Sequence, residues 1–453
     1  MLFVCATVFV VVLSGTMLPV ALPAIGESLT LGPARLGWLI TGFFLVNGVA
    51  IPFFGRLGDL YGVRRVYAAG MLAFFLGSLV CAMAPVYSIL MAGRLVQGAG
   101  AAAVVGLGSA AVSLAYDPRN RGTAIGMLGA TAGVGAAIGP VAGGVVTDFA
   151  SWRYLFVAGI LFCLLVPFAS RILPHGEAPG SQRLDLYGGM LLGLALAGLL
   201  LALTEGANRG WGTPLVVWSA FVAAAASGLL VVRQRTAENP FIPRQLLTNR
   251  FYVLLVAVTL LFLGINITIE VALPLLLAEV NDLPPSLIGF VLLPQALTLV
   301  VCGPIAGRLA DRAGVTKPVQ LGAAFVVVAL LLLSSFGVGG PVWLASALAA
   351  VISAGTVFAR IATTTGVSLA VEKENLASGL AINEMSSMLG VSVGTALFSA
   401  TLSARSSSSS ALNFLHTGPA VNYSDAFLML AIPLSTVLLL SIKLSKSKTG
   451  QQV

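Results

Sequence analysis

Charged residues are scarce along this chain of 453 residues. They make up 9% of it, whereas hydrophobic residues make up 58%. A soluble domain is typically about a quarter charged and roughly half apolar. So much apolar surface exceeds what the core of a soluble domain can bury, and lipid is the solvent expected for most of it. The composition therefore indicates an all-α polytopic membrane protein.

Residues that carry enzyme or metal chemistry are also rare. The two histidines, His175 and His416, both fall in predicted loops, and no nucleophile stands beside a base. The cysteines lie within apolar runs without metal-ligand spacing, which favours small buried side chains over disulfides or ligands. They are Cys5, Cys81, Cys163 and Cys302. We therefore expect no enzyme activity, no cofactor and no metal site.

The apolar runs are long enough to cross a bilayer, which takes about 20 residues in a helix. Fourteen spans are predicted, at 1–24, 36–56, 66–84, 88–114, 122–146, 154–173, 185–204, 213–232, 251–277, 286–307, 317–337, 341–366, 377–402 and 424–443. An even number of spans places both termini on the same side of the membrane.

The basic residues predict which side that is. With a cytoplasmic N-terminus, eighteen of the 24 lysines and arginines fall in cytoplasmic loops or the C-terminal tail. Arg94 and Arg360 fall inside spans. The outer loops hold Arg35, Arg153, Arg209 and Arg405. Because cytoplasmic loops carry an excess of Lys and Arg, both termini are predicted to be cytoplasmic, and the net charge of +8 indicates topology rather than nucleic-acid binding.

The chain contains an internal repeat. PVALP at 19–23 returns as EVALP at 270–274, and a series of Gly, Pro, Arg, Leu and Asp returns 252 positions later. The first copy of the series is Gly37, Pro52, Gly55, Arg56, Leu57, Asp59 and Gly62, and the second is Gly289, Pro304, Gly307, Arg308, Leu309, Asp311 and Gly314. An ordered series at constant spacing indicates duplication. We predict six-helix halves at 1–173 and 251–443, with two inserted helices at 185–232.

The repeated segments, GRLGDLYGVRR at 55–65 and GRLADRAG at 307–314, are turns between predicted spans. Asp59 is placed to pair with an arginine or to face a helix N-terminus. Such a contact would latch the two halves on the cytoplasmic side, so that breaking it switches the conformation. The predicted switch residues here are Gly55, Asp59, Gly62, Arg64, Arg65, Asp311 and Arg312. The alternative is a pair of well-packed turns with arginines that set topology.

Three motifs resemble the major facilitator superfamily, in particular its fourteen-helix drug:proton antiporter branch. The loop signature G-x-L-a-D-x-x-G-x-(R/K)-(R/K) is matched by Gly55, Leu57, Asp59, Gly62, Arg64 and Arg65. The fourth-helix signature R-x-x-Q-G-x-G is matched by Arg94, Gln97, Gly98 and Gly100. The fifth-helix signature G-x-x-x-G-P-x-x-G-G, which marks exporters in that superfamily, is matched by Gly135, Gly139, Pro140, Gly143 and Gly144. RGTAIG at 121–126 also looks like the tetracycline:proton exporters.

The resemblance implies a major facilitator fold, drug export coupled to protons, and residence in a bacterial plasma membrane. One departure is clear. The branch usually carries an acidic residue in its first helix, within a pattern like D-x-T-I-V-N-V-A-L-P, whereas this chain has Ser14 at the acidic position and Pro19 at the asparagine position. Whatever that carboxylate does in relatives is absent here or handled elsewhere.

Charged residues at membrane depth cost at least a few kcal/mol and need a reason. Glu270, in the first helix of the second half, is the predicted proton carrier because a desolvated carboxylate exchanges protons readily. The alternative is a permanent pair with Arg360. Glu384 is a second carboxylate for cation recognition or proton relay, or a group bonded to a neighbouring helix. The resemblance assigns Arg94 to coupling, and a satisfied buried arginine is the alternative.

Other polar residues are candidates for the substrate cavity. Arg360 neutralises Glu270 or Glu384, or recognises an anionic group of the substrate. The predicted cavity hydrogen-bonders are Asn47, Asn266, Gln295 and Asn383, with helix–helix contact as the alternative for each. The small residues of GATAGVGAAIGPVAGG at 129–144 are expected at the interface between the halves, where Pro140 permits a bend.

These observations favour a proton-coupled secondary transporter that exports hydrophobic, cationic or amphiphilic drugs by alternating access. We expect a monomer in the lipid bilayer that handles a small-molecule substrate and protons. The alternative is a proton-coupled carrier of a specific metabolite or an organic or lipid-like anion, because of Arg360 and the missing first-helix carboxylate. A membrane enzyme or sensor is disfavoured because no soluble domain is evident, and a channel because neither half has a filter-like loop.

Overall fold

The computed structural model describes residues 1–161, 173, 184–283, 285–405, 410–416, 418 and 420–446. Within these residues the chain is helical without a strand, and thirteen helices are long and apolar enough to cross a membrane. They correspond one by one to thirteen of the fourteen predicted spans. The sixth predicted span, 154–173, begins with η2 (Trp152–Phe156) and α6 (Val157–Leu161) and then lies mostly outside the described residues.

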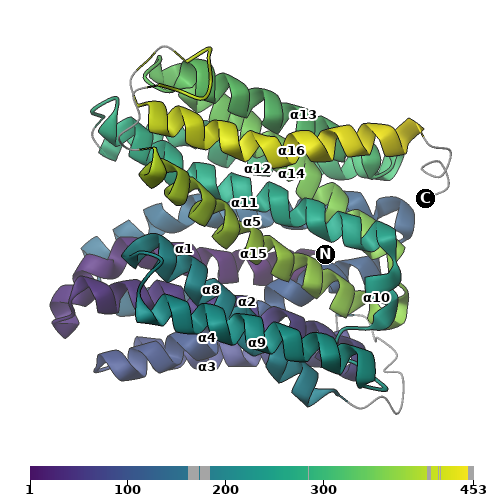
Figure 1. Ribbon diagram of the computed structural model, residues 1–453. Helices are drawn as coiled ribbons and strands as arrows, with labels where there is room; N and C mark the ends of the chain where they lie inside the picture. Colours follow the sequence, from purple (N-terminus) through teal and green to yellow (C-terminus); the bar gives the residue numbers. More distant parts are fainter. Residues whose placement is uncertain are drawn as a thin grey trace.

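The helices form two groups, drawn from purple to blue and from green to yellow in Figure 1. The first group comprises α1 (Leu2–Leu29), α2 (Pro33–Tyr61), α3 (Val63–Ala82), α4 (Tyr87–Ala115), η1 (Pro118–Asn120), α5 (Arg121–Phe149), η2 and α6. Next come α8 (Leu186–Arg209), α9 (Pro214–Thr236) and α10 (Arg244–Thr248). The second group comprises α11 (Arg250–Glu279), α12 (Pro285–Ala313), α13 (Thr316–Leu332), the π-helical turn η4 (Leu333–Gly337), α14 (Val342–Ala370), η5 (Lys373–Asn375), α15 (Leu376–Ala404) and α16 (Val421–Lys446).

The predicted duplication is visible in the helix lengths. α2 and α12 have 29 residues each and begin 252 positions apart. α4 and α14 have 29 residues each and begin 255 apart, as do α5 and α15. The spacing grows from 252 at α2 and α12 to 255 at α4 and α14, and the π-helical turn η4 lies within this stretch of the second half.

Two seams join the groups. α5 packs against α12, and α2 packs against α15, so α5 and α15 lie in the middle of Figure 1. Glycines bring the backbones into contact: a Cβ on Gly307 would overlap the carbonyl of Gly122, and one on Gly55 would overlap Ala381. Such close approach of helices is typical of membrane proteins, where small residues replace the hydrophobic effect as the basis of packing.

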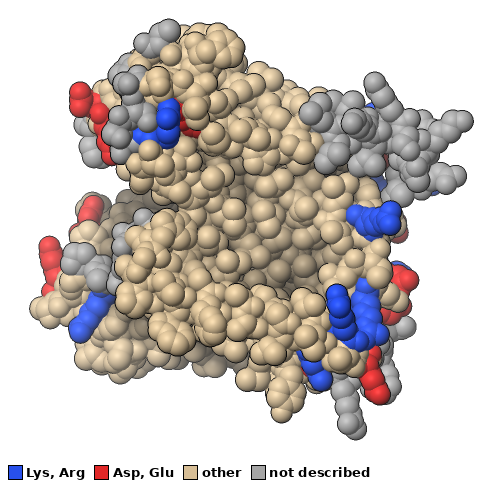
Figure 2. Space-filling view, in the orientation of Figure 1, with Lys and Arg blue, Asp and Glu red and all other residues tan. Residues whose placement is uncertain are grey.

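The two ends of the molecule differ. One end carries the turns after α2, α4, α12 and α14, and we call it the basic end because Lys and Arg gather there, at the right in Figure 2. At the opposite end, the open end, the surface is hollowed between the two groups of helices. The groups therefore meet at the basic end and part toward the open end.

The inserted helices lie beside one seam. α8 packs against both α2 and α15, and α9 packs against α8. The Asp185 carboxylate, at the N-terminus of α8, binds Arg233 of α9 with Nη2 and Oδ1 3.0 Å apart. The insertion is therefore a helical hairpin, which we call the inserted hairpin.

The crossing of α11 and α15 generates a stability prediction. A Cβ on Gly390 would overlap the carbonyl of Leu260, so Gly390→Ala should force the helices apart and cost about 1–3 kcal/mol. The midpoint of thermal unfolding of the detergent-solubilised protein should fall by several degrees. Gly228→Ala on α9 is the matched control because nothing lies within 4 Å of its added Cβ. Equal midpoints for the two variants would contradict this packing.

Candidate functional site

Asp59 closes the α2/α15 seam at the basic end. Its Oδ1 accepts from the backbone N–H of Ala377 at 2.8 Å, and its Oδ2 accepts from that of Ser378 at 2.9 Å. Both donors lie in the first turn of α15, where backbone N–H groups lack intrahelical acceptors and carry partial positive charge. Both predicted kinds of partner are therefore present, because the charge of Asp59 also interacts with that of Arg56.

Asp311 makes the repeat-related contact across the α5/α12 seam. Its Oδ1 accepts from Gly122 N at 2.7 Å, and its Oδ2 accepts from the N–H and the hydroxyl of Thr123 at 2.7 and 2.6 Å. We call the Asp59 and Asp311 contacts the latches. Hydrogen bonds to charged groups contribute about 1.5–3 kcal/mol each, so the latches stabilise the closed basic end.

The other predicted switch residues shape the turn around each latch. Gly62 and Gly314 follow α2 and α12 with φ of 88° and 75°, a conformation that favours glycine. Arg65 and Arg312 are exposed, and Arg64 is half-buried. The sequence motifs did not predict the latch donors, although Thr123 and Ser378 stand 255 positions apart, each two residues after the start of an equivalent helix.

The small residues at 129–144 were predicted at the interface between the halves. That prediction is confirmed for Gly129 and Gly133, which face α14 and α12, and wrong for the glycines of the fifth-helix signature. A Cβ on Gly143 would lie 2.6 Å from the carbonyl oxygen of Met17, and one on Gly139 would overlap the Thr16 hydroxyl, so these residues face α1. Gly144 likewise approaches Val20. The remaining signature residues are Gly135, which faces Phe9 of α1, and Pro140, which is exposed.

The glycines of α5 that meet the second half form a different set. They are Gly122, Gly126 and Gly133, which face Gly307, Gly303 and Leu299 of α12. At 3.6 residues per turn, this set and the signature glycines occupy different faces of the same helix. Small residues lie on both of these faces of α5. Their positions in the sequence therefore do not indicate which face packs against α1 and which packs against α12.

Arg94 is satisfied inside the first half. It is 1% exposed, its Nε donates to the Leu39 carbonyl at 3.2 Å, and its Nη1 donates to Oε1 of Gln97 at 2.6 Å. Its guanidinium lies 4.1 Å from the ring centroid of Phe43. Gln97 in turn donates to the Ser78 hydroxyl at 2.8 Å. Among the described residues no carboxylate pairs with Arg94, and this agrees with the alternative of a satisfied buried arginine.

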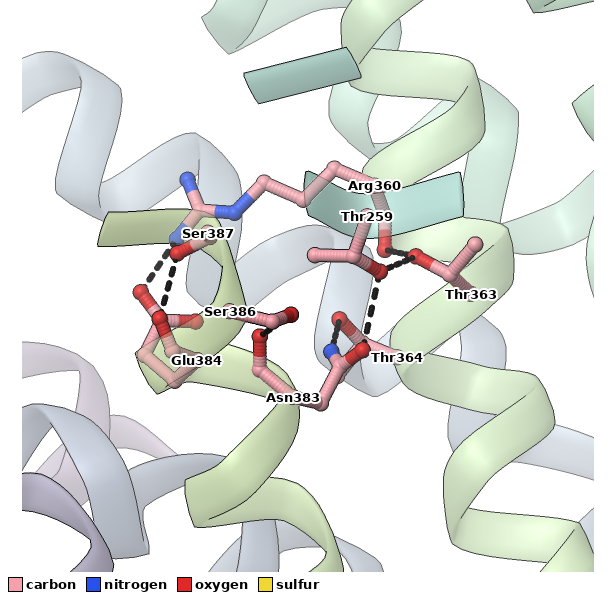
Figure 3. Close-up of polar contacts among 8 residues, drawn as sticks. All are labelled: Thr259, Arg360, Thr363, Thr364, Asn383, Glu384, Ser386 and Ser387. Carbon is pink, nitrogen blue, oxygen red and sulfur yellow. Dashed lines mark hydrogen bonds and ion pairs between the residues drawn. The ribbon is translucent and has the colours of Figure 1, made fainter. Parts of the chain in front are cut away.

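Arg360 pairs with Glu384 rather than with Glu270. Its Nη2 lies 3.2 Å from Oε1 of Glu384, which joins α14 to α15 (Figure 3). The two side chains are 31% and 13% exposed, so neither is sealed from a ligand. In this conformation the charge of Arg360 is compensated by Glu384.

A cluster of hydroxyl and amide groups lies beside this pair. The Thr259 hydroxyl of α11 lies 2.8 Å from the Thr363 hydroxyl oxygen of α14 and 2.8 Å from Oδ1 of Asn383 on α15. Nδ2 of Asn383 donates to the Thr364 hydroxyl at 3.5 Å (Figure 3). We call these four residues the threonine cluster. Asn383 was predicted as a cavity residue and the threonines were not: Thr363 and Thr364 lie in a run of threonines at 363–365, and Thr259 has no such signal.

Glu270 lies on the interior side of α11. Asn266, one turn before it, donates to the Thr356 hydroxyl of α14 at 3.0 Å, and the same face carries Thr259. Glu270 is exposed, and within the described part of the chain it forms no ion pair. In this conformation the halves are parted toward the open end (Figure 2), and the desolvated proton carrier at Glu270 stays a prediction.

The remaining amides differ in their surroundings. Asn47 donates to the Gly98 carbonyl at 3.3 Å and joins α2 to α4 as a helix–helix contact. Gln295 is 5% exposed, and neither polar side-chain atom has a partner among the described residues. Its repeat counterpart, Phe43, stacks on Arg94, whereas the counterpart of Arg94 in the second half is Ala349. Ala349, which takes the place of Arg94 in the second half, has no polar side-chain group.

Two related helix groups that part at one end around ionisable residues are the architecture of a secondary transporter. The family model described as Major Facilitator Superfamily matches residues 4–395 and 254–450. The chain belongs to the Major Facilitator Superfamily. It is therefore a multi-pass membrane transporter and not an enzyme, as the motifs predicted.

Three comparisons place it more closely. The chain is 28% identical over 348 residues to the riboflavin transporter RibZ of Clostridioides difficile, covering 76% of this chain and 75% of that one. It is 31% identical over 329 residues to the multidrug resistance protein Stp of Mycobacterium tuberculosis, covering 72% of this chain but only 61% of Stp. The human organic anion transporter MFSD10 has the same fold, with a TM-score of 0.69, 17% identity, and coverage of 96% and 98%.

The latches generate a prediction about access. Asp59→Asn removes the charge that binds the first turn of α15, so the α2/α15 seam should part more often at the basic end. Ile51→Cys reports this, because Ile51 is fully buried in a cluster with Ala102 and Ala381 of α15. In a chain whose natural cysteines are replaced by alanine, labelling of that cysteine by a maleimide should quicken about tenfold, as expected for about 1.4 kcal/mol.

The control for this experiment is Asp117→Asn, which changes an exposed carboxylate at the same end of the molecule. It should leave the labelling rate unchanged. A similar rate in the Asp59→Asn and Asp117→Asn backgrounds would show that the latch does not hold the seam.

Proposed function

We propose that this protein exports hydrophobic, cationic or amphiphilic compounds in exchange for protons by alternating access. The observation that carries the proposal is Glu270, an exposed carboxylate at membrane depth on the interior side of α11, without an ion-pair partner in the described chain. An ionisable group in such a position is costly unless it serves the transported species. The name of the relative Stp, a multidrug resistance protein, supports export of drugs.

The proposal includes an orientation. The basic end faces the cytoplasm of a bacterium, both termini are cytoplasmic, and the open end faces outward. The excess of Lys and Arg at the basic end supports this through the positive-inside rule. The two moving bodies are the halves at 1–173 and 251–443, which act together as one monomer.

The transport cycle starts from the outward-open conformation. A proton from outside reaches Glu270 through the open end and neutralises it, so that a bound cation is released. The halves then rock, the latches at Asp59 and Asp311 break, and the cavity opens inward. The proton leaves to the cytoplasm, and a new cation takes its place at the ionised Glu270.

The energy available is sufficient for such a cycle. A pH difference of one unit supplies about 1.4 kcal/mol per proton, and about 100 mV adds roughly 2.3 kcal/mol per charge moved. Breaking the latch hydrogen bonds costs free energy. In the proposed cycle, equivalent contacts that form at the outer end offset this cost when the basic end opens. One or two protons then support a tenfold gradient of substrate.

The other charged residues take supporting roles in the proposal. Arg360 and Glu384 compensate one another, which leaves Glu270 as the group whose charge changes with the bound species. Glu384 assists when Arg360 moves away from it. Arg94 stabilises the first half through Gln97 and Phe43 rather than carrying protons.

Glu270→Gln tests the proton carrier. A glutamine cannot release a proton, so pH-driven uptake of a cationic dye such as ethidium into everted vesicles should fall at least tenfold with unchanged expression. Glu279→Gln on the same helix is the matched control, because Glu279 accepts a hydrogen bond from the Tyr423 hydroxyl at 2.6 Å and an amide oxygen can do the same. Proton-coupled dye transport that survives in the Glu270→Gln variant would sink the assignment.

A second candidate function is a proton-coupled carrier of a metabolite or an organic anion. The observation that favours it is Arg360, which at 31% exposure is able to exchange Glu384 for a substrate anion. The name of one relative, the riboflavin transporter RibZ, supports carriage of a metabolite.

A charge-neutral double variant separates the two candidates. Arg360→Gln alone leaves Glu384 without its partner, which is destabilising for a partly buried charge. Arg360→Gln combined with Glu384→Gln removes both charges and should restore ethidium export to within a few-fold of the parent. Transport of an organic anion would be lost in both variants. Loss of ethidium export in the double variant would contradict the supporting role given to this pair.

A further inference from the structure

We infer that the inserted hairpin α8–α9 is carried by the first half during transport, while α15 of the second half slides beneath it. This inference rests on the proposed rocking of the two halves. It concerns one seam, because α8 packs against both α2 and α15. When the basic end opens, these two helices separate and the hairpin can follow only one of them.

The hairpin moves as one unit. Asp185 binds Arg233 across the pair, and its Oδ1 also accepts from the backbone N–H of Gly188 at 3.1 Å. Where the helices cross, a Cβ on Gly198 would lie 2.7 Å from the carbonyl oxygen of Ser219. The backbones of α8 and α9 are therefore in direct contact at this crossing, so we expect the two helices to move together.

The contact of α8 with α2 is interlocked. A Cβ on Gly189 would lie 2.8 Å from the ring of Phe53, and one on Gly193 would lie 3.4 Å from both Phe53 and Val49. Phe241, in the segment after α9, packs on the same Phe53 with ring centroids 5.1 Å apart. The Phe53 ring is thus held between a glycine face of α8 and the chain that returns from α9.

The contact of α8 with α15 is of a different kind. Leu192 and Leu196 of α8 belong to a hydrophobic cluster that includes Met385 and Leu389 of α15 as well as Val49 and Phe53 of α2. None of the five glycines of α8 has an atom of α15 among its nearest neighbours. Methionine is flexible and adapts to a moving surface, whereas withdrawal of Phe53 from its glycine face would leave a cavity. The α2 side is therefore the fixed one and the α15 side the sliding one.

This arrangement has a consequence for transport. At the basic end α2 and α15 touch closely, with a Cβ on Gly58 only 3.1 Å from Cβ of Ala377, and this contact must break for the cavity to open inward. A hairpin that stays on α2 keeps the lipid-facing side of this seam covered while it opens. The duplicated fold then has one seam that is shielded throughout the cycle.

Distances between spin labels test which half the hairpin follows. Three exposed positions at the basic end carry the labels in pairs: Arg65 on α3, Lys317 on α13 and Arg235 on α9. The natural cysteines are replaced by alanine, and the protein is reconstituted in liposomes at pH values on both sides of neutrality. The double variant Asp59→Asn and Asp311→Asn serves to populate the inward-open conformation.

The expected result is a longer 65–317 distance on opening, an unchanged 235–65 distance, and a 235–317 distance that shifts together with 65–317. A constant 235–317 distance would overturn the inference, and so would a hairpin that moves relative to both halves. A 65–317 distance that never changes would contradict alternating access itself, and the inference with it.

Disulfides give a second measurement. The pair Val49→Cys and Gly193→Cys joins α2 to α8, with Cβ atoms within about 5 Å and thus close to disulfide range. Its oxidation should leave at least half of ethidium export intact. The matched pair Gly58→Cys and Ala377→Cys joins the halves, and its oxidation should abolish export until a reductant is added. The inference would be overturned if oxidation of the Val49→Cys and Gly193→Cys pair stopped export while oxidation of the Gly58→Cys and Ala377→Cys pair did not.

The two failures remain distinguishable. If the reduced protein does not move ethidium at all, the proposed export of cations fails, and the spin-label distances still decide which half carries the hairpin. If export proceeds with the Gly58→Cys and Ala377→Cys pair joined, rocking of the halves fails. Normal export together with a hairpin that follows α15 contradicts the inference alone.

Discussion

The structure depends on a carboxylate that binds the free N–H groups at the start of a helix in the opposite half. Asp59 and Asp311 make this contact across the two seams, and each satisfies donors that the helix itself leaves open. The interaction requires α15 or α5 to be in position, because its donors are backbone groups of those helices. It therefore belongs to one conformation of the halves, which is what a latch in a moving protein must do.

Duplication preserved the packing of the halves but not the chemistry inside them. In the first half the buried guanidinium of Arg94 is stabilised by two hydrogen bonds and by a cation–π contact. In the second half Arg360 and Glu384 pair at the edge of a threonine cluster, and Glu270 stands apart from them. The repeat aligns Glu270 with Pro19 of the first half. In the proposed cycle, the residues that change protonation therefore lie in the second half, and the rocking of the two halves is what transmits their state to the first.

Much of the fold was predictable because the bilayer imposes a simple rule on length and composition. Each described span is long enough and apolar enough to cross the bilayer. The repeat at 252 positions places Asp59 and Asp311 in equivalent turns. The site was predictable only in part. A helix N-terminus was foreseen as a partner for Asp59, but not which helix, since the sequence separation from Ala377 holds no local signal. The glycines at 135–144 were assigned to the wrong neighbour because a small residue shows only that something approaches closely.

By itself the sequence determined that the chain crosses the membrane many times, that it consists of two related halves with an insertion, and that few ionisable residues remain inside the bilayer. These follow from composition, periodicity and repetition, which are properties of the chain alone. Only the tertiary structure decided that Arg360 meets Glu384, that Glu270 is exposed on the interior side of α11, and that α8 bridges α2 and α15. Which residues contact one another across helices depends on the face that each packed helix turns toward its neighbour. The sequence does not determine this, because several arrangements of the same helices satisfy the same pattern of apolar residues.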